Sequence, residues 1–185
     1  NTLNPNENGP GAPCSILTNS ASTLTLDASD TIEAAYLYWA GSGTGDFDIS
    51  LNGTAIAASR RFALTQPSSG LPFFSAFANI TSQVQTTGNG LYTFADLDLT
   101  GVIPNYCGNG TNFGGWAIIV IYKNDALPLN QLNVYDGLES VPSVLNITLD
   151  NLNVIDNEDA KIGFLAWEGD RSIAVNETLR INGNI

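Results

Sequence analysis

The sequence contains no histidine and no methionine, and charged residues make up only 13% of its 185 residues. Without histidine, serine and cysteine hydrolases lack their usual general base. A zinc site would also have too few ligands, because only two cysteines are present. Six Lys and Arg stand against 18 Asp and Glu, giving a formal net charge of -12. Such a chain repels phosphate, so we expect no nucleic-acid partner and no anionic-membrane partner.

Long apolar runs are also missing, and none approaches the ~20 residues that a membrane-spanning helix needs. We therefore expect a protein that is not membrane-embedded. The apolar fraction of 43% and the length of 185 residues suit one globular domain. The chain begins at Asn1 rather than at Met, which we interpret as a mature or excised fragment. Residues 1–14 are rich in Asn, Pro and Gly and are predicted to form an extended tail or linker before a single domain at 15–185.

The two cysteines, Cys14 and Cys107, both lie in segments rich in Gly, Pro and Asn. Inert core thiols usually lie in apolar elements instead, so we predict that these two form a disulfide. Two separate free thiols are the alternative. The disulfide would join the N-terminal segment to the loop before residues 116–123, and it indicates an oxidising, extracellular setting.

Alternating apolar and polar residues recur along the chain, with turn residues between the runs. This pattern is typical of an all-β fold, and we predict a two-sheet antiparallel sandwich, jelly-roll-like in form. Asn52-Gly53 lies between two alternating runs within residues 47–58 and predicts a hairpin with a type I′ turn. Further strands are expected at residues 22–28, 31–41, 90–99, 116–123, 129–137, 144–152, 160–169 and 177–185.

One segment has a helical spacing instead, and it predicts one short covering helix near residues 74–86, closed by Gly88. The apolar residues at spacings of three and four are Phe73, Phe77, Ile80 and Val84. Residues 116–122 are apolar on both faces, so a strand there must be covered on both faces. We expect the helix to cover the outer face of this strand. The alternative is a strand that faces a partner subunit.

Six sequence blocks together resemble a domain of large secreted cell-surface proteins of Bacteroidota. In chain order they read AAYLYWAGSG, DISLNG, FANITSQVQTTGNGLYTFADL, GGWAIIVIY, LNVYDGL and FLAWEGDR. The family is multidomain and adhesin-like, and many members carry a C-terminal signal for type IX secretion. The resemblance covers residues 31–185, implies a location outside the cell, and supplies no catalytic residues. Family members continue past the block that matches TLRING, so a domain truncated at its C-terminus is expected.

Carboxylates are the remaining candidates for chemistry. A glycosidase needs a pair of them, and the candidates are Glu33, Asp136, Glu139, Glu168 and Asp170. Nothing in the sequence places two of these across a cleft, so we predict that the protein is not an enzyme.

Calcium is the one cofactor for which the sequence offers oxygen ligands. Residues 45–48 and 156–159 are acidic, but neither has the spacing of a known calcium loop, and we interpret both as solvated turns. The strand ends at Asp136, Glu168 and Asp170 are a further calcium candidate. A local ion pair with Arg171 is the preferred interpretation there, so we expect no cofactor.

Candidate sites of glycan attachment are numerous because Asn and Thr are abundant. Asn-X-Ser/Thr occurs at Asn52, Asn79, Asn109, Asn146 and Asn176, and chance explains most of these matches. The triplet Asp30-Thr31-Ile32 is similar to a short O-glycan acceptor pattern of Bacteroidota, which implies a sugar on Thr31.

Three functions remain. The preferred one is a non-catalytic structural or adhesive module at the cell surface, with other protein subunits or surface glycans as partners. The second is a carbohydrate-binding module that stacks sugar rings on Tyr36, Tyr38 and Trp39, although these are equally suited to a core. The third is a subunit of an extracellular filament assembled by strand exchange, with residues 15–26 as the donor strand.

Overall fold

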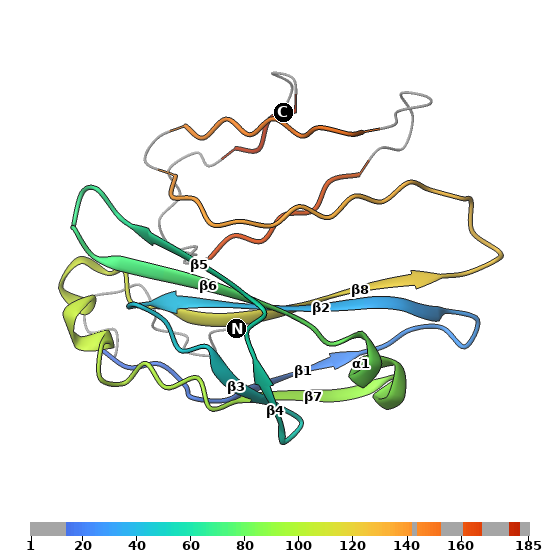
Figure 1. The fold of residues 1–185 in the computed structure, drawn as a ribbon, viewed down its shortest axis with the longest axis horizontal. Helices are drawn as coiled ribbons and strands as arrows, with labels where there is room; N and C mark the ends of the chain where they lie inside the picture. Colours follow the sequence, from blue (N-terminus) through green and yellow to red (C-terminus); the bar gives the residue numbers. More distant parts are fainter. Residues whose placement is uncertain (1–13, 142–143, 153–160, 168–177, 182–185) are drawn as a thin grey trace.

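The computed structural model describes residues 14–141, 144–152, 161–167 and 178–181. Two four-stranded antiparallel sheets pack face to face (Figure 1), which confirms the predicted two-sheet sandwich. Sheet A has the order β1 (Ser20–Leu24), β7 (Gly90–Ala95), β3 (Asp48–Leu51) and β4 (Thr54–Ala57). Sheet B has the order β5 (Arg60–Thr65), β6 (Pro72–Asn79), β2 (Thr31–Ser42) and β8 (Gly114–Lys123).

Alternate residues of the central strands fill the space between the sheets. Along β2 these are Ala35, Leu37 and Trp39, and all three are fully buried. Sheet A contributes residues such as Leu51 and Phe94 to the same core. Because side chains alternate along a strand, the intervening residues of β2 lie on the other side of sheet B, which we call its outer face.

The predicted Asn52-Gly53 hairpin is confirmed. It joins β3 to β4, with Leu51 paired to Thr54 across the turn. Asn52 and Gly53 both have positive φ, 51° and 75°, as a type I′ turn requires. The turn is therefore one place where local chemistry alone determines the fold.

The helix expected near residues 74–86 is only partly present, because Pro72–Asn79 forms strand β6 and α1 spans only Thr81–Thr87. Residues 73–78 are buried on both faces of the strand, and a continuous apolar run of this kind is compatible with either structure. Two short 3-10 turns, η1 (Ile103–Asn105) and η2 (Cys107–Asn109), complete the helical elements of the described residues.

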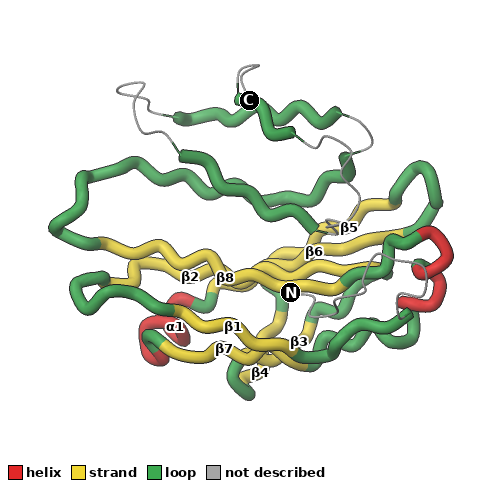
Figure 2. The backbone as a smooth tube through the Cα atoms, turned by 180° about the vertical axis from the view of Figure 1, so that it is seen from behind, coloured by secondary structure: helices red, strands yellow, loops and turns green. Residues whose placement is uncertain are grey.

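The predicted position of the helix over the outer face of residues 116–122 is wrong. α1 lies at one end of the sandwich, where Val84 reaches the core between the sheets (Figures 1 and 2). Gln83 donates to Leu51 O at 2.8 Å, and Gln85 donates to Ile32 O at 2.8 Å. The helix therefore bridges β3 of sheet A and β2 of sheet B instead of covering a sheet face.

Among the described residues β8 is an edge strand, bonded only to β2. Its residues Trp116, Ile118 and Val120 pack against the core between the sheets. Trp116 stacks on Phe94 with ring centroids 5.4 Å apart and donates its indole N–H to Ser20 Oγ at 2.6 Å. The long apolar run is thus buried mainly against sheet A.

The segments after β8 run over the outer face of sheet B (Figure 1). The four strands expected between residues 129 and 185 are not formed in the described part of this region, where only a single bridge residue occurs at Ile181. Large apolar side chains are exposed here, including Leu129 (100%), Leu132, Val144, Ile147, Phe164 and Ile181. In the described part of this region, the segments with the alternating pattern therefore do not form a sheet.

Candidate functional site

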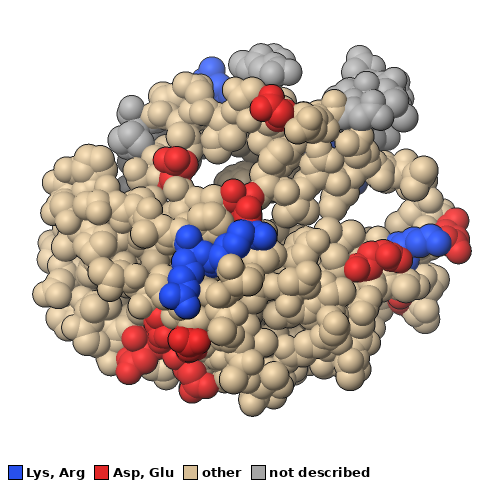
Figure 3. Space-filling model, viewed as in Figure 1, with Lys and Arg blue, Asp and Glu red and all other residues tan. Residues whose placement is uncertain are grey.

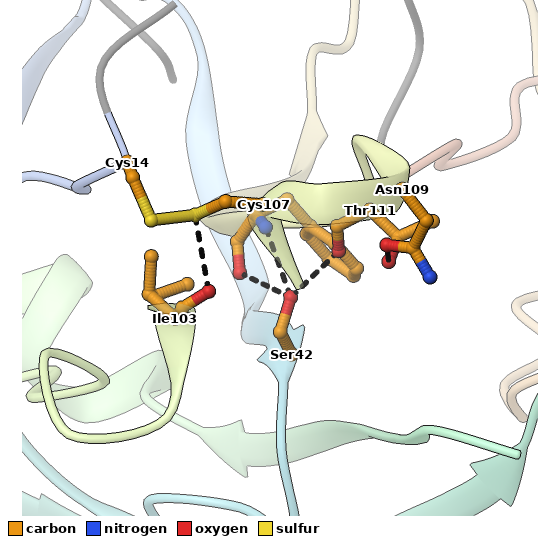
Figure 4. Close-up of a disulfide and its surroundings, with 7 residues drawn as sticks. Cys14, Ser42, Ile103, Cys107, Asn109 and Thr111 are labelled. Carbon is orange, nitrogen blue, oxygen red and sulfur yellow. Dashed lines mark hydrogen bonds between the residues drawn. A yellow bond between two sulfur atoms is a disulfide. The ribbon is translucent and has the colours of Figure 1, made fainter. Parts of the chain in front are cut away.

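The cysteines form the predicted disulfide between Cys14 and Cys107, across a sequence separation of 93 residues (Figure 4). It joins the start of the described chain to the two 3-10 turns that precede β8. Cys107 Sγ also lies 3.2 Å from Ile103 O. Because a disulfide sulfur carries no hydrogen, this is a sulfur–oxygen contact and not a hydrogen bond. The bridge thus ties the N-terminal end of the described chain to the loop region before β8.

Ser42, the last residue of β2, supports the other side of the same loop. Its fully buried hydroxyl donates to Thr111 O at 2.9 Å and accepts from Phe113 N at 3.0 Å (Figure 4). The neighbouring Gly41 lets the chain pack closely here, since a Cβ there would lie 2.5 Å from Leu99 Cδ1 and 3.1 Å from Phe113 O. The loop before β8 is therefore fixed covalently at one point and by hydrogen bonds at another.

Polar side chains elsewhere in the sandwich also bind backbone groups, either of their own turn or of a neighbouring segment. Asn52 Oδ1 accepts from Thr93 N at 2.7 Å. Asn89 both accepts from Leu26 N and donates to Leu26 O, at 2.7 and 2.8 Å. Asn79 accepts from the backbone and the hydroxyl of Thr81 at 3.0 and 2.7 Å. These amides hold turns in place, which is the chemistry of a rigid scaffold.

The structure describes three of the five candidate carboxylates, Glu33, Asp136 and Glu139. Asp136 pairs with Arg60, whereas Glu33 on β2 and Glu139 are exposed. Glu168, Asp170 and Arg171 lie outside the described residues. Asp136 is thus engaged by an arginine, and the expectation that the protein is not an enzyme stays a prediction.

In the acidic turn at residues 45–48, the Asp46 carboxylate accepts hydrogen bonds from backbone N–H groups. Asp46 Oδ2 accepts from Asp98 N at 2.9 Å, and its Oδ1 accepts from Asp48 N at 3.4 Å. In the part of the chain that the structure describes, no group of three or more His, Cys, Asp or Glu is placed to hold a metal ion. Residues 156–159, the other calcium candidate, lie outside that part.

The aromatic residues proposed for sugar stacking are mostly core residues. Trp39 is fully buried and donates its indole N–H to Asp46 O at 2.8 Å. Tyr38 is 7% exposed and meets Phe77 edge-on, with ring centroids 5.2 Å apart. Tyr36 is half-buried beside the same Phe77. The three side chains therefore offer no shared platform to a sugar ring.

The candidate attachment sites Thr31, Asn52, Asn79, Asn109 and Asn146 are all exposed. Asn176 lies outside the described residues. Glycan attachment at these positions stays a prediction.

An ion pair on the outer face of sheet B is a feature that the sequence did not predict. Arg60 of β5 donates through Nε to Asp136 Oδ2 at 2.9 Å and also binds it through Nη2. The guanidinium lies over the Phe77 ring, 3.6 Å from its centroid. Seventy-six positions separate the two charged residues, so no local pattern indicates the pair. It attaches the segment after β8 to the far edge of the sheet.

We expect Asp136→Asn to loosen this segment while it leaves the sandwich intact. Arg60 and Asp136 are partly exposed, with side-chain exposures of 50% and 24%, so screening limits the pair to about 1 kcal/mol or less. Cleavage of residues 128–141 in limited proteolysis should then rise up to about fivefold, with little change in melting temperature. Glu139→Gln is the matched control, and equal cleavage in both variants would contradict the assignment.

Three buried tyrosines give the fold a dependence on alkaline pH. Burial raises the pKa of Tyr38, Tyr92 and Tyr106 in the folded chain, and for Tyr38 the nearby Asp136 carboxylate adds to the increase. Tyr92 donates to Gly88 O at 2.7 Å and Tyr106 to Pro72 O at 2.6 Å, and both bonds need the neutral phenol.

The unfolded chain ionises these tyrosines near pH ~10, before the folded chain does. Stability from their burial is therefore complete below pH ~10 and is lost as pH rises through the folded pKa values. Urea unfolding followed from neutral to alkaline pH should show this loss, with a shallower decline for Tyr106→Phe. A constant free energy of unfolding well above the tyrosine pKa range would contradict it.

Together these features define the chain as a disulfide-linked antiparallel β-sandwich. None of its described helices is both long enough and apolar enough to cross a membrane. Comparison of the chain with models of known protein families, with curated proteins and with solved structures found no match.

Proposed function

We propose that this chain is a non-catalytic, extracellular structural or adhesive module of a bacterial cell-surface protein. The observation that carries the proposal is the use of its polar side chains. Asp46, Asn52, Asn79 and Asn89 hydrogen-bond to nearby turns and strands instead of converging on a common space. A scaffold of this kind keeps its shape under load and presents its surface without performing chemistry.

The disulfide supports a location outside the cell, because disulfides persist in oxidising compartments. The resemblance to secreted, adhesin-like proteins of Bacteroidota supports the same location. It also favours export by the type IX system as part of a longer protein.

The surface supports weak and repeated contacts. Figure 3 shows a face on which a few basic groups adjoin acidic groups and most of the surface carries no charge. Neutral amide and hydroxyl groups form hydrogen bonds to sugars and proteins with little electrostatic steering. Such contacts hold a cell to its target when many copies act together.

Isothermal titration and an activity screen on the purified chain test this proposal. We expect no turnover of peptide, ester or glycan substrates, and glycan affinities for one copy no tighter than the order of millimolar. Turnover that disappears in Asp136→Asn or Glu168→Gln would contradict the non-catalytic role. Tight stoichiometric binding of a small ligand would contradict the dependence on many copies.

One observation also favours the filament alternative. β8 is a ten-residue apolar strand at a sheet edge, which is the kind of element that accepts a strand from a neighbour. The donor expected at residues 15–26 is not free, because Ser20–Leu24 forms β1 and pairs with β7 of its own chain. A filament would therefore need another donor.

A further inference from the structure

The edge of β8 lacks the features that normally protect an edge strand. Among the described residues no strand lies beyond β8, so alternate backbone N–H and C=O groups of the strand point away from the sheet. Natural edges are usually blocked by charge, proline or a bulge on the strand itself. Residues 114–122 carry no charge and no proline, and the only charged residue is Lys123 at the end. The edge is therefore open to pairing with another strand.

Residues 144–152 have the complementary properties. Leu145, Ile147 and Leu149 alternate with Asn146 and Thr148, as a strand with one apolar face requires. Ile147 is 67% exposed, and no backbone–backbone hydrogen bond joins this segment to the other described residues. At nine residues the segment nearly matches the length of β8, which has ten.

The segment is kept away from β8 of its own chain. Tyr135 donates its hydroxyl to Asp150 O, and Asn133 donates to Asn151 O at 3.1 Å. Residues 129–137 thus contact one side of the segment, and Figures 1 and 2 both show them between it and sheet B. Figure 3 also shows openings between the segments after β8 and the sandwich. Val144 and Ile147 are 72% and 67% exposed, so among the described residues nothing covers these side chains fully.

We propose that β8 accepts residues 144–152 of a second copy of this chain as an added antiparallel strand. Antiparallel pairing continues the pattern of sheet B, in which every pair is antiparallel. In the register that matches the apolar faces, Ile147 lies opposite Ile118, which extends the layer between the sheets. The two elements carry one charge each, Lys123 and Asp150, so the net charge of -12 does not oppose their contact locally.

The same register places the other apolar residues of the donor opposite core-facing residues of the acceptor, and these pairs are Leu145 with Val120 and Leu149 with Trp116. Each copy then offers one donor and one acceptor at different places. Such a contact is head-to-tail, so it repeats into an open filament unless the rotation between copies closes a ring. The inference rests on the proposed function and deepens it by naming the partner.

Single cysteine variants test the register, because the chain has no other free cysteine among its described residues. In this register Ala117 of one copy lies opposite Thr148 of the next, on the outer face. An oxidised mixture of Ala117→Cys and Thr148→Cys chains should form a cross-linked dimer. A mixture of Ala117→Cys and Ile147→Cys chains should not form the cross-linked dimer, because adjacent strand residues point to opposite faces.

The double variant Ala117→Cys/Thr148→Cys distinguishes pairing between neighbouring copies from pairing within one chain. We expect cross-linked oligomers, and a cross-link confined to the monomer would show that residues 144–152 pair with their own β8 and would overturn the proposal.

Sedimentation of the unmodified chain across a concentration series provides a second measurement that needs no cysteine. We expect association that is lost in Ile147→Pro, which removes a backbone donor, and kept in Ile147→Val. A chain that stays monomeric at its highest soluble concentration would overturn the proposal. That result would leave the non-catalytic role untouched, since titration and the activity screen test it separately.

Discussion

Removing the disulfide should lower the free energy of unfolding by about 4–5 kcal/mol, according to the chain-entropy model. The bridge closes a loop across a separation of 93 residues, so it strongly restricts the unfolded chain. Urea unfolding of a Cys14→Ser/Cys107→Ala variant measures the loss. This is a large share of the ~5–15 kcal/mol available to a domain, so the variant should melt at a much lower temperature.

Two controls separate the covalent bond from the loop contacts around it. Wild-type chain unfolded with and without reductant should show the same loss as the double variant. Ser42→Ala keeps the bridge but leaves Phe113 N without its side-chain acceptor, which should cost about 1–3 kcal/mol. Equal stability of the oxidised and reduced chains would contradict the assigned role of the disulfide.

Trp39→Ala should cost about 3–5 kcal/mol, the second largest effect. The side chain is fully buried, and β2 places it between Ala76 of β6 and Trp116 of β8. Its ring also lies 6.4 Å from that of Phe94 in sheet A. Its removal leaves a cavity at the contact between the sheets, and thermal unfolding followed by circular dichroism measures the cost.

Trp39→Phe is the matched control. It retains most of the apolar ring but removes the indole N–H that Asp46 O accepts. We expect a smaller loss, about 1–3 kcal/mol, from the missing hydrogen bond and the smaller ring. A Trp39→Ala chain that melts like wild type would show that this residue lies outside the cooperative core.

The parts of the fold that sequence predicts are those that local chemistry determines. Asn-Gly fixes a hairpin because both residues accept positive φ, and the aromatic residues of β2 favour a strand. The helix predicted near residues 74–86 is partly wrong because the apolar residues of Pro72–Asn79 fit a helix as well as a buried strand. Strand β5, Arg60–Thr65, is not among the predicted strands, and none of its residues is fully buried.

The candidate site was less predictable than the fold because its contacts are distant in sequence. The disulfide is predictable because both cysteines lie in segments rich in Gly, Pro and Asn, and two cysteines allow only one intramolecular pairing. The Arg60–Asp136 pair depends on a segment that crosses a sheet face, and hydrophobic pattern carries no information about it. The pattern did indicate strands after residue 128, but it does not specify which sheet edge they join.

Hydrogen exchange at increasing protein concentration tests the central claim, that this module combines a closed sandwich with an open strand edge and an unpaired donor segment. In dilute solution we predict slow exchange in the strands of both sheets and fast exchange in residues 144–152. As concentration rises, exchange should slow together in residues 144–152 and in the outward amides of Gly114–Lys123. Slow exchange in residues 144–152 that does not depend on concentration would contradict the account.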